Sequence, residues 1–353
     1  MWIPNAHIPS NRQSMSSIHR VELSWIVAIQ GDGTIRDLMI MVSYLGFEVF
    51  PYVLPFVYFC LSRTAGQRLF LLFSLTGWLL HILKLACHMP RPFWMDDRVK
   101  ALSDSGGYGM PSGHVLWAVV VWPYVARTVG KYSILMVAII IVLLVSISRV
   151  YLGVHFISDV VAAWIIGTGL IWCFEWTEQT LCSWLRSLSF WHRMLIVMWA
   201  TVALLFVGFG VQGATRNVVD SFNWSTYSVG ARSLSGLIQS VGELFGTACG
   251  ILLAGHWASF EVRGEVWRRG FAFGYALGGA WLIRDLTNVL PSMHTETLQF
   301  LKTFLYGAVS NFWMLFLAPL LLLKARVLQA PASNVNMTAC VSESRATSVR
   351  NDP

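Results

Sequence analysis

Long runs of mostly apolar residues fill this chain of 353 residues, and short polar segments separate them. A helix needs about 20 apolar residues to cross a hydrocarbon core of about 30 Å, and most of the runs reach that length. They lack the alternation of polar and apolar residues that membrane β-strands show, so they predict helices. The predicted fold is an all-α polytopic membrane bundle of about nine transmembrane helices, at approximately 38–62, 69–87, 111–127, 132–150, 155–176, 194–211, 234–254, 271–290 and 300–324.

The segments outside these runs divide the chain into four parts. Residues 1–37 form an N-terminal arm, in which 18–31 is amphipathic at the helical period. That stretch is too short and too charged to span, so we place it in the membrane interface. Residues 38–211 form a core of six predicted spans, and residues 212–326 form an extension of three. Residues 327–353 are rich in Ser, Asn, Ala and Thr, and we expect them to be disordered.

The composition excludes a soluble globular domain of this size. Hydrophobic residues make up 56% of the chain, charged residues make up 12%, and the mean hydropathy is +0.59. The net charge of +7 is scattered over many loops without a basic stripe. We therefore expect anionic lipid headgroups and a phosphorylated substrate as partners, and no nucleic acid. The six cysteines lack metal-ligand or disulfide-framework spacing. No pattern in the sequence specifies an oligomeric state.

Three clusters of polar residues stand at the ends of predicted spans. In chain order they are Lys84 with Pro90-Arg91-Pro92, then Pro111-Ser112-Gly113-His114, then Ser148-Arg149 with His155 and Asp159. Together they contain two histidines, three cations and one carboxylate. These are the residue types needed to transfer a phosphoryl group without a metal, and we expect neither a metal nor another cofactor.

The second cluster has the features of an anion-binding helix start. Proline is favoured in a first helical turn because it needs no amide partner there. The small Ser112 and Gly113 let the following amides approach an anion at the positive end of the helix dipole. His114 would then face the same anion. The alternative is an ordinary helix start with an interfacial histidine.

His155 and Asp159 are four residues apart, which places them on one face of a helix. Asp159 can then accept a hydrogen bond from one ring nitrogen of His155, which leaves the other nitrogen free as a nucleophile. A capping pair at the start of the fifth predicted span is the alternative. Lys84, Arg91 and Arg149 either turn toward a common pocket or extend to lipid headgroups, as lone cations at span ends commonly do.

The three clusters taken together are too specific for chance. The pattern K-x6-R-P, P-S-G-H, S-R-x5-H-x3-D has eleven fixed positions. At about one in twenty for each position and with free spacing between the clusters, it would arise at random with a probability of roughly 10⁻⁷. The set resembles the three signature motifs of the type 2 phosphatidic acid phosphatase and vanadium haloperoxidase superfamily, and the resemblance covers at most the first six predicted spans. It implies His155 as the nucleophile that becomes phosphorylated, Asp159 as its orienting partner and His114 as the acid for the leaving group. It also implies a cradle for the phosphate oxygens, made by Lys84, Arg91, Arg149, Ser112 and the Gly113 amide.

The resemblance predicts a membrane phosphatase that hydrolyses a phosphorylated lipid of the phosphatidate, polyprenyl pyrophosphate or sphingoid phosphate type. The nine predicted spans and the N-terminal arm also resemble the glucose-6-phosphatases, but these lack an aspartate four residues after the nucleophile, and Asp159 stands there in this chain. A sugar phosphatase, a lipid phosphotransferase and a transporter that binds phosphorylated lipid are the alternatives.

The span count also predicts which side of the membrane carries the site. It places Lys84, His114, Arg149 and His155 on the same side as the N-terminus. The distribution of Lys and Arg over the loops favours that side as the outer one. We expect a bacterial inner membrane with a periplasm-facing site, and an endoplasmic reticulum membrane with a lumen-facing site is the alternative.

Overall fold

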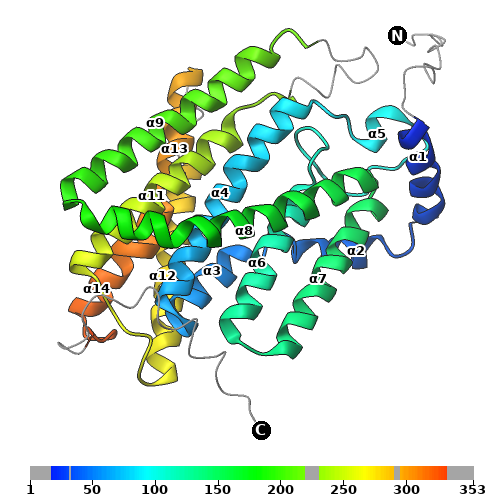
Figure 1. The fold of residues 1–353 in the computed structure, drawn as a ribbon. Helices are drawn as coiled ribbons and strands as arrows, with labels where there is room; N and C mark the ends of the chain where they lie inside the picture. The colour runs from blue at the N-terminus through cyan, green and yellow to red at the C-terminus, as the bar shows by residue number, and fades with distance from the viewer. Residues whose placement is uncertain (1–16, 32, 219–229, 290–294, 332–353) are drawn as a thin grey trace.

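The computed structural model describes residues 17–31, 33–218, 230–289 and 295–331, which fold into helices joined by loops (Figure 1). The N-terminal half contains α1 (Ser17–Gln30), α2 (Arg36–Tyr44), α3 (Phe50–Phe56) continued by a π-helical turn (Val57–Leu61), α4 (Arg63–Cys87), α5 (Pro92–Met95), α6 (Gly113–Val129), α7 (Tyr132–Tyr151) and α8 (Ile157–Ser187). The C-terminal half contains α9 (Phe190–Thr215), α11 (Ser235–Trp257), α12 (Val266–Val289), α13 (Glu296–Phe312), a second π-helical turn (Trp313–Leu317) and α14 (Ala318–Lys324). The prediction of an all-α polytopic bundle is confirmed. Most of the predicted tail, from residue 332 onward, lies outside the described residues.

The predicted count of nine spans is not supported. The described residues contain six helical stretches that are long and apolar enough to cross a membrane, namely Arg63–Met95, Tyr132–Tyr151, Ile157–Ser187, Phe190–Thr215, Ser235–Trp257 and Glu296–Lys324. The first predicted span, 38–62, is broken by a turn at 45–49 into α2 and a short apolar helix, Phe50–Leu61. α6 has only 17 residues, and α12 carries several charged residues. The glucose-6-phosphatase-like topology depended on the count of nine and has no support.

The chain reverses direction between α4 and α6, between α6 and α7, and between α7 and α8. Gly130 ends α6 in a left-handed conformation, and α7 begins two residues later and packs against α6. α6 also packs against α4 and α8. As a result, the C-terminal ends of α4 and α7 lie beside the N-terminal ends of α6 and α8, where all three polar clusters are located.

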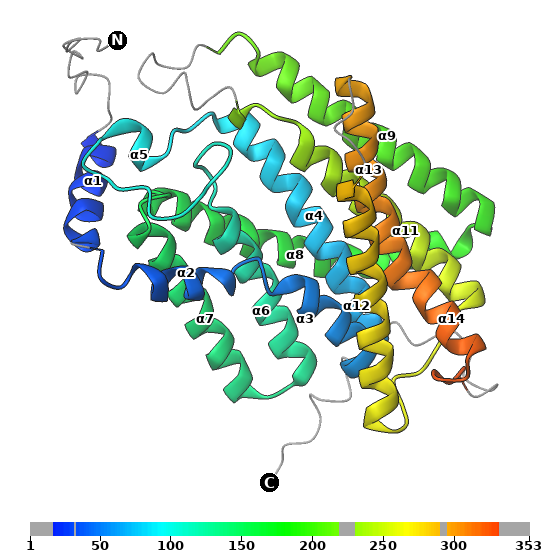
Figure 2. The same cartoon turned by 180° about the vertical axis from the view of Figure 1, so that it is seen from behind.

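The C-terminal half is joined to this bundle mainly through α11, which packs against α4, α9 and α13 (Figure 2). Gly242 and Gly246 of α11 are four residues apart, on one helix face. A β-carbon at these positions would overlap the carbonyl oxygens of Phe304 and Ala308 in α13. Small residues therefore let the two backbones approach closely, as they do in many membrane helix pairs.

α1 packs on the end of the molecule that carries the polar clusters. Leu23 and Ile26 are buried there, and the Gln30 side chain exchanges hydrogen bonds with the backbone of Lys100. Another row of apolar side chains on the same helix, which includes Val21 and Trp25, is exposed. The placement of this helix in the membrane interface stays a prediction.

Candidate active site

A cavity of about 420 Å³ lies where the ends of α4, α6, α7 and α8 meet. Most of the residues that the sequence analysis proposes for the site line it: Lys84, Arg91, Gly113, His114, Arg149 and His155. The two remaining residues, Ser112 and Asp159, are buried next to lining residues, with exposed fractions of 0% and 1%. The fold thus brings all three clusters together around one hollow.

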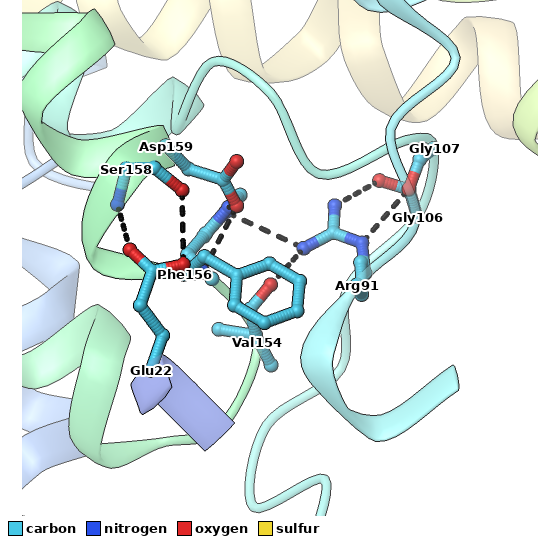
Figure 3. Close-up of polar contacts among 9 residues, drawn as sticks. Glu22, Arg91, Gly106, Gly107, Val154, Phe156, Ser158 and Asp159 are labelled. Carbon is cyan, nitrogen blue, oxygen red and sulfur yellow. Dashed lines mark hydrogen bonds and ion pairs between the residues drawn. The ribbon is translucent and has the colours of Figure 1, made fainter. Parts of the chain in front are cut away.

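The His155 imidazole is fixed by the carboxylate one helical turn later. Its Nδ1 donates to Asp159 Oδ2 at 3.2 Å, and the same oxygen accepts from the backbone N–H of Phe156 at 3.0 Å (Figure 3). The proton of the neutral ring is therefore on Nδ1 and the lone pair is on Nε2. Burial and the charges of Arg91 and Arg149 lower the pKa of His155 well below its usual value. The ring is consequently neutral near neutral pH.

Arg91 links His155 to the loop that precedes α6. Figure 3 shows Arg91 with its partners Val154, Gly106 and Gly107. Its Nη1 donates to the Val154 carbonyl oxygen at 2.8 Å and lies 3.3 Å from His155 Nε2. Its Nε and Nη2 donate to the carbonyl oxygens of Gly107 and Gly106, at 2.8 and 2.6 Å. The guanidinium is thereby held beside the ring nitrogen that carries the lone pair.

Arg149 Nε and the Ser112 hydroxyl are among the buried donors near the cavity that have no partner within the residues that the structure describes. Arg149, at the end of α7, donates from Nη1 to Ser43 Oγ of α2 at 2.6 Å, whereas its Nε is unpaired. The hydroxyl of Ser112 is unpaired as well. Burying a donor without an acceptor is unfavourable, and an anion with several oxygens would satisfy both.

The start of α6 is fastened to the start of α8. The backbone N–H of Ser112 donates to the carbonyl oxygen of Asp159 at 3.2 Å. Gly113 and His114, in the first turn of α6, line the cavity. The positive end of the α6 dipole therefore lies at the cavity, where it favours a bound anion.

His114 has a carboxylate partner that the sequence analysis did not identify. Its Nε2 lies 3.3 Å from Oε1 of Glu48, in the turn between α2 and α3. Burial raises the pKa of Glu48, but the hydrogen bond and charge of His114 and the charge of Arg149 outweigh that effect, so the pKa lies below its usual value. The available signal was a carboxylate inside the predicted first span, where a charge is costly without a function.

The N-terminal helix α1 supplies a further supporting contact that the sequence analysis did not identify. Glu22 of α1 accepts from the Ser158 backbone N–H at 2.8 Å and from its hydroxyl at 3.2 Å (Figure 3). A carboxylate at the N-terminus of α8 is favoured by the helix dipole. The amphipathic pattern of residues 18–31 did not indicate this contact, because Glu22 reads there as part of an ordinary polar helix face.

The cavity presents an imidazole lone pair beside cations and N–H donors. This arrangement suits an anion with tetrahedrally placed oxygens. Within the described ranges, no group of three or more His, Cys, Asp or Glu side chains is arranged to hold a metal ion.

Fold and site together define a helical membrane protein with a histidine-containing anion site. The family described as PAP2 superfamily matches residues 66–182, and the family described as PAP2 superfamily phosphatase, transmembrane extension, matches residues 238–331. The two matches together cover more than half of the chain. The chain therefore belongs to the PAP2 superfamily of membrane phosphatases and carries its transmembrane extension, which confirms the superfamily resemblance.

Three curated relatives are each 29% identical to this chain over the aligned residues. Phosphatidylglycerophosphatase B of Bacillus subtilis aligns over 38% of this chain and 70% of its own length. Undecaprenyl-diphosphatase of Sulfolobus acidocaldarius aligns over 45% and 79%, and sphingosine-1-phosphate phosphatase 2 of Mus musculus over 36% and 38%. A crystal structure of a transmembrane PAP2-type phosphatidylglycerolphosphate phosphatase from Bacillus subtilis matches with a TM-score of 0.40 and 23% identity, over 48% of this chain and 90% of that chain.

Proposed function

We propose that this protein hydrolyses a phosphorylated lipid through a phosphohistidine at His155. The observation that carries the proposal is the convergence of His155, His114 and three cations on one cavity. The membrane-embedded bundle supports a substrate that reaches the site from the bilayer. The three curated relatives, whose names all specify phosphorylated lipids, support the same substrate class.

In the first step, Nε2 of His155 attacks phosphorus as the bond from phosphorus to the lipid oxygen breaks. Asp159 holds the Nδ1–H and stabilises the positive charge that develops on the ring. His114, polarised by Glu48, donates a proton to the departing alkoxide, so that a neutral alcohol leaves. Lys84, Arg91 and Arg149, with the Ser112 hydroxyl and the Gly113 amide, offset the charge on the phosphoryl oxygens.

In the second step, His114 acts as the base. It removes a proton from a water molecule that attacks the phosphoryl group on His155, and the bond between nitrogen and phosphorus breaks. Phosphate leaves, and His155 returns to its neutral form with the proton on Nδ1. Both histidines then stand as they did before the first step, so the cycle closes without a further reactant.

The test is a comparison of His155→Ala with His192→Ala in detergent. His192 is an exposed histidine near the start of α9, away from the cavity. We expect His155→Ala to lower the rate of phosphate release from a lipid phosphate by at least about 10³-fold, because the nucleophile is lost. His192→Ala should match the unmodified protein.

Protein incubated with ³²P-labelled lipid phosphate and quenched in alkaline detergent should carry a label that is stable to base and lost in acid, and His155→Ala should lack this label. A normal rate for His155→Ala, or a lipid phosphate that is bound and moved across vesicles without release of phosphate, would contradict the proposal. The second result would point to a transporter.

A further inference from the structure

The cavity is lined by a second group of residues besides the proposed phosphate-binding ones. This group consists of side chains from one face of α11 and a neighbour on α4, and we name it the α11 wall: His81, Gly236, Gln239, Ser240 and Glu243. The α11 positions have the spacing of a single helix face. α11 packs against α4, and most of this face lies in the segment that matches the transmembrane extension, 238–331.

In two members of the α11 wall, Ser240 and His81, the polar hydrogen atom of the side chain is already donated to a backbone carbonyl oxygen. The Ser240 hydroxyl donates to the Gly236 carbonyl oxygen at 2.9 Å, which leaves its oxygen lone pairs. His81 Nδ1 lies 2.6 Å from the Gly77 carbonyl oxygen. Because a carbonyl only accepts, Nδ1 carries the proton, and in the neutral ring Nε2 is an acceptor.

The other two polar members leave more acceptors than donors. Gln239 Nε2 donates to Glu243 Oε1 at 2.9 Å. When Glu243 is ionised, its second oxygen and the amide oxygen of Gln239 remain as acceptors, against one remaining amide hydrogen. The cations that line the same cavity have the reverse character, because Lys84, Arg91 and Arg149 only donate.

The space suits a group attached to the phosphate. A tetrahedral phosphate has five non-hydrogen atoms and fills roughly 100–150 Å³, at about 30 Å³ or slightly less for each water-sized atom. The cavity of about 420 Å³ leaves the larger share for the neighbouring part of the substrate. That part lies against the α11 wall when the phosphate lies against the cations.

We propose that the α11 wall binds a hydrogen-bond donor, a hydroxyl or an ammonium, on the carbon next to the phosphoester carbon of the lipid substrate. This inference rests on the proposed function and narrows its substrate class. Glycerol phosphates with a free hydroxyl and sphingoid phosphates carry such a donor. Phosphatidate and polyprenyl diphosphates do not. A site built to accept a hydrogen bond discriminates strongly against an analogue that lacks the donor, because buried acceptors are then left unpaired.

The experiment uses two pairs of probes with the full-length protein in detergent. The hydroxyl pair is 1-oleoyl-glycerol 3-phosphate and its 2-deoxy analogue, and the ammonium pair is sphingosine 1-phosphate and its 2-desamino analogue. We expect kcat/KM to favour the donor-bearing member of at least one pair by about tenfold or more. The pair that shows the larger preference identifies the donor as hydroxyl or ammonium.

Variants of the α11 wall test whether the preference for the donor-bearing substrate depends on Glu243. Glu243→Leu should reduce it to below about threefold while the rate on the donor-free analogue stays near that of the unmodified protein, which also shows that the variant folds. Glu243→Gln keeps one acceptor oxygen and should give an intermediate preference. Glu175→Gln, on the exposed face of α8, is the matched control and should change nothing.

The possible failures are distinct. Equal hydrolysis of both members in both pairs would overturn the α11 wall as a donor-binding subsite and leave the phosphatase proposal intact. A strong preference that survives Glu243→Leu would overturn the assignment to this wall. If the protein hydrolyses neither the four probes nor any other lipid phosphate, the proposed function is overturned, and this inference with it.

Discussion

At the scale of single residues, the two histidines of the cavity are held by two different carboxylates. His155 is paired with a fully buried aspartate one helical turn away, and His114 with Glu48, which is 43% exposed at its side chain and comes from another part of the chain. The two imidazoles are proposed to need opposite charge states. Asp159 fixes the tautomer of His155, and Glu48 stabilises the protonated form of His114.

The pH dependence of the reaction should report this difference. Because the pKa of His155 is lowered well below its usual value of about 6.5, His155 protonates only at lower pH, and the acid limb of kcat/KM should lie below about pH 6.5. The basic limb should reflect loss of the proton from His114, whose pKa burial lowers below its usual value in spite of the hydrogen bond to Glu48. Steady-state kinetics between pH 4 and 9 test the assignment, and an acid limb at or above about pH 6.5 would contradict it.

Glu48→Gln should shift only one of the two limbs. The variant removes the negative charge that stabilises protonated His114, so the basic limb should move to lower pH. The value of kcat/KM at pH 7 should fall by about tenfold, which is less than the factor of about 10²–10⁴ that general acid catalysis contributes as a whole. The acid limb should stay in place. A uniform loss of activity at every pH would instead indicate a structural role for Glu48.

The sequence predicted those site residues that belong to local patterns. The Ser112 start of α6 and the four-residue spacing of His155 and Asp159 are local, so their arrangement follows from helical geometry. Glu48 and Glu243 reach the cavity through helix packing, which no local pattern encodes. Both are carboxylates in apolar surroundings, and that cost was the only signal available from the sequence alone.

At the scale of helices, the contact between α11 and α13 depends on small residues. The hydrophobic effect that stabilises a soluble helix pair has no equivalent in lipid, so close backbone approach supplies much of the attraction. The hydropathy of the two helices says little about this contact. For the same reason hydropathy overcounted the spans, since it does not distinguish one crossing helix from α2 and α3 with a turn between them.

Gly246→Ala and Gly255→Ala, in the same helix, should differ in their effects on stability. A β-carbon at Gly246 would overlap the Ala308 carbonyl oxygen, whereas one at Gly255 would meet nothing within 4 Å. We expect Gly246→Ala to destabilise the protein by about 1–3 kcal/mol, as overpacked sites commonly do. Gly255→Ala should be neutral or stabilising because alanine has the higher helix propensity. Melting temperatures in detergent test both, and equal melting temperatures would contradict the close contact.

At the scale of the whole molecule, the site occupies one end of the bundle and the hairpin loop between α6 and α7 the other. Asp97, in the loop after α5, is exposed at the site end, and Lys131 is exposed at the hairpin. The distribution of basic residues led us to predict that the site end faces outward. The structure identifies one exposed loop at each end, so the side of the membrane that each end faces can be tested.

Cysteine labelling should establish this orientation. In a background without the six native cysteines that retains activity, Asp97→Cys should react with a membrane-impermeant maleimide in spheroplasts. Lys131→Cys should react only after the membrane is permeabilised. The reverse pattern would place the site on the cytoplasmic side and refute the predicted orientation, while the chemistry proposed for the cavity would be unaffected.

The hydrogen bond from the Ser112 backbone to the Asp159 carbonyl has a consequence for how such proteins diversify. This bond joins the first turn of α6, which faces the anion, to Asp159, which orients the attacking imidazole. A change in the position of one therefore disturbs the other. New substrate preferences must then arise on a surface that this bond does not involve. In this chain α11 offers such a surface, and its sequence can change while the residues that carry the reaction are kept.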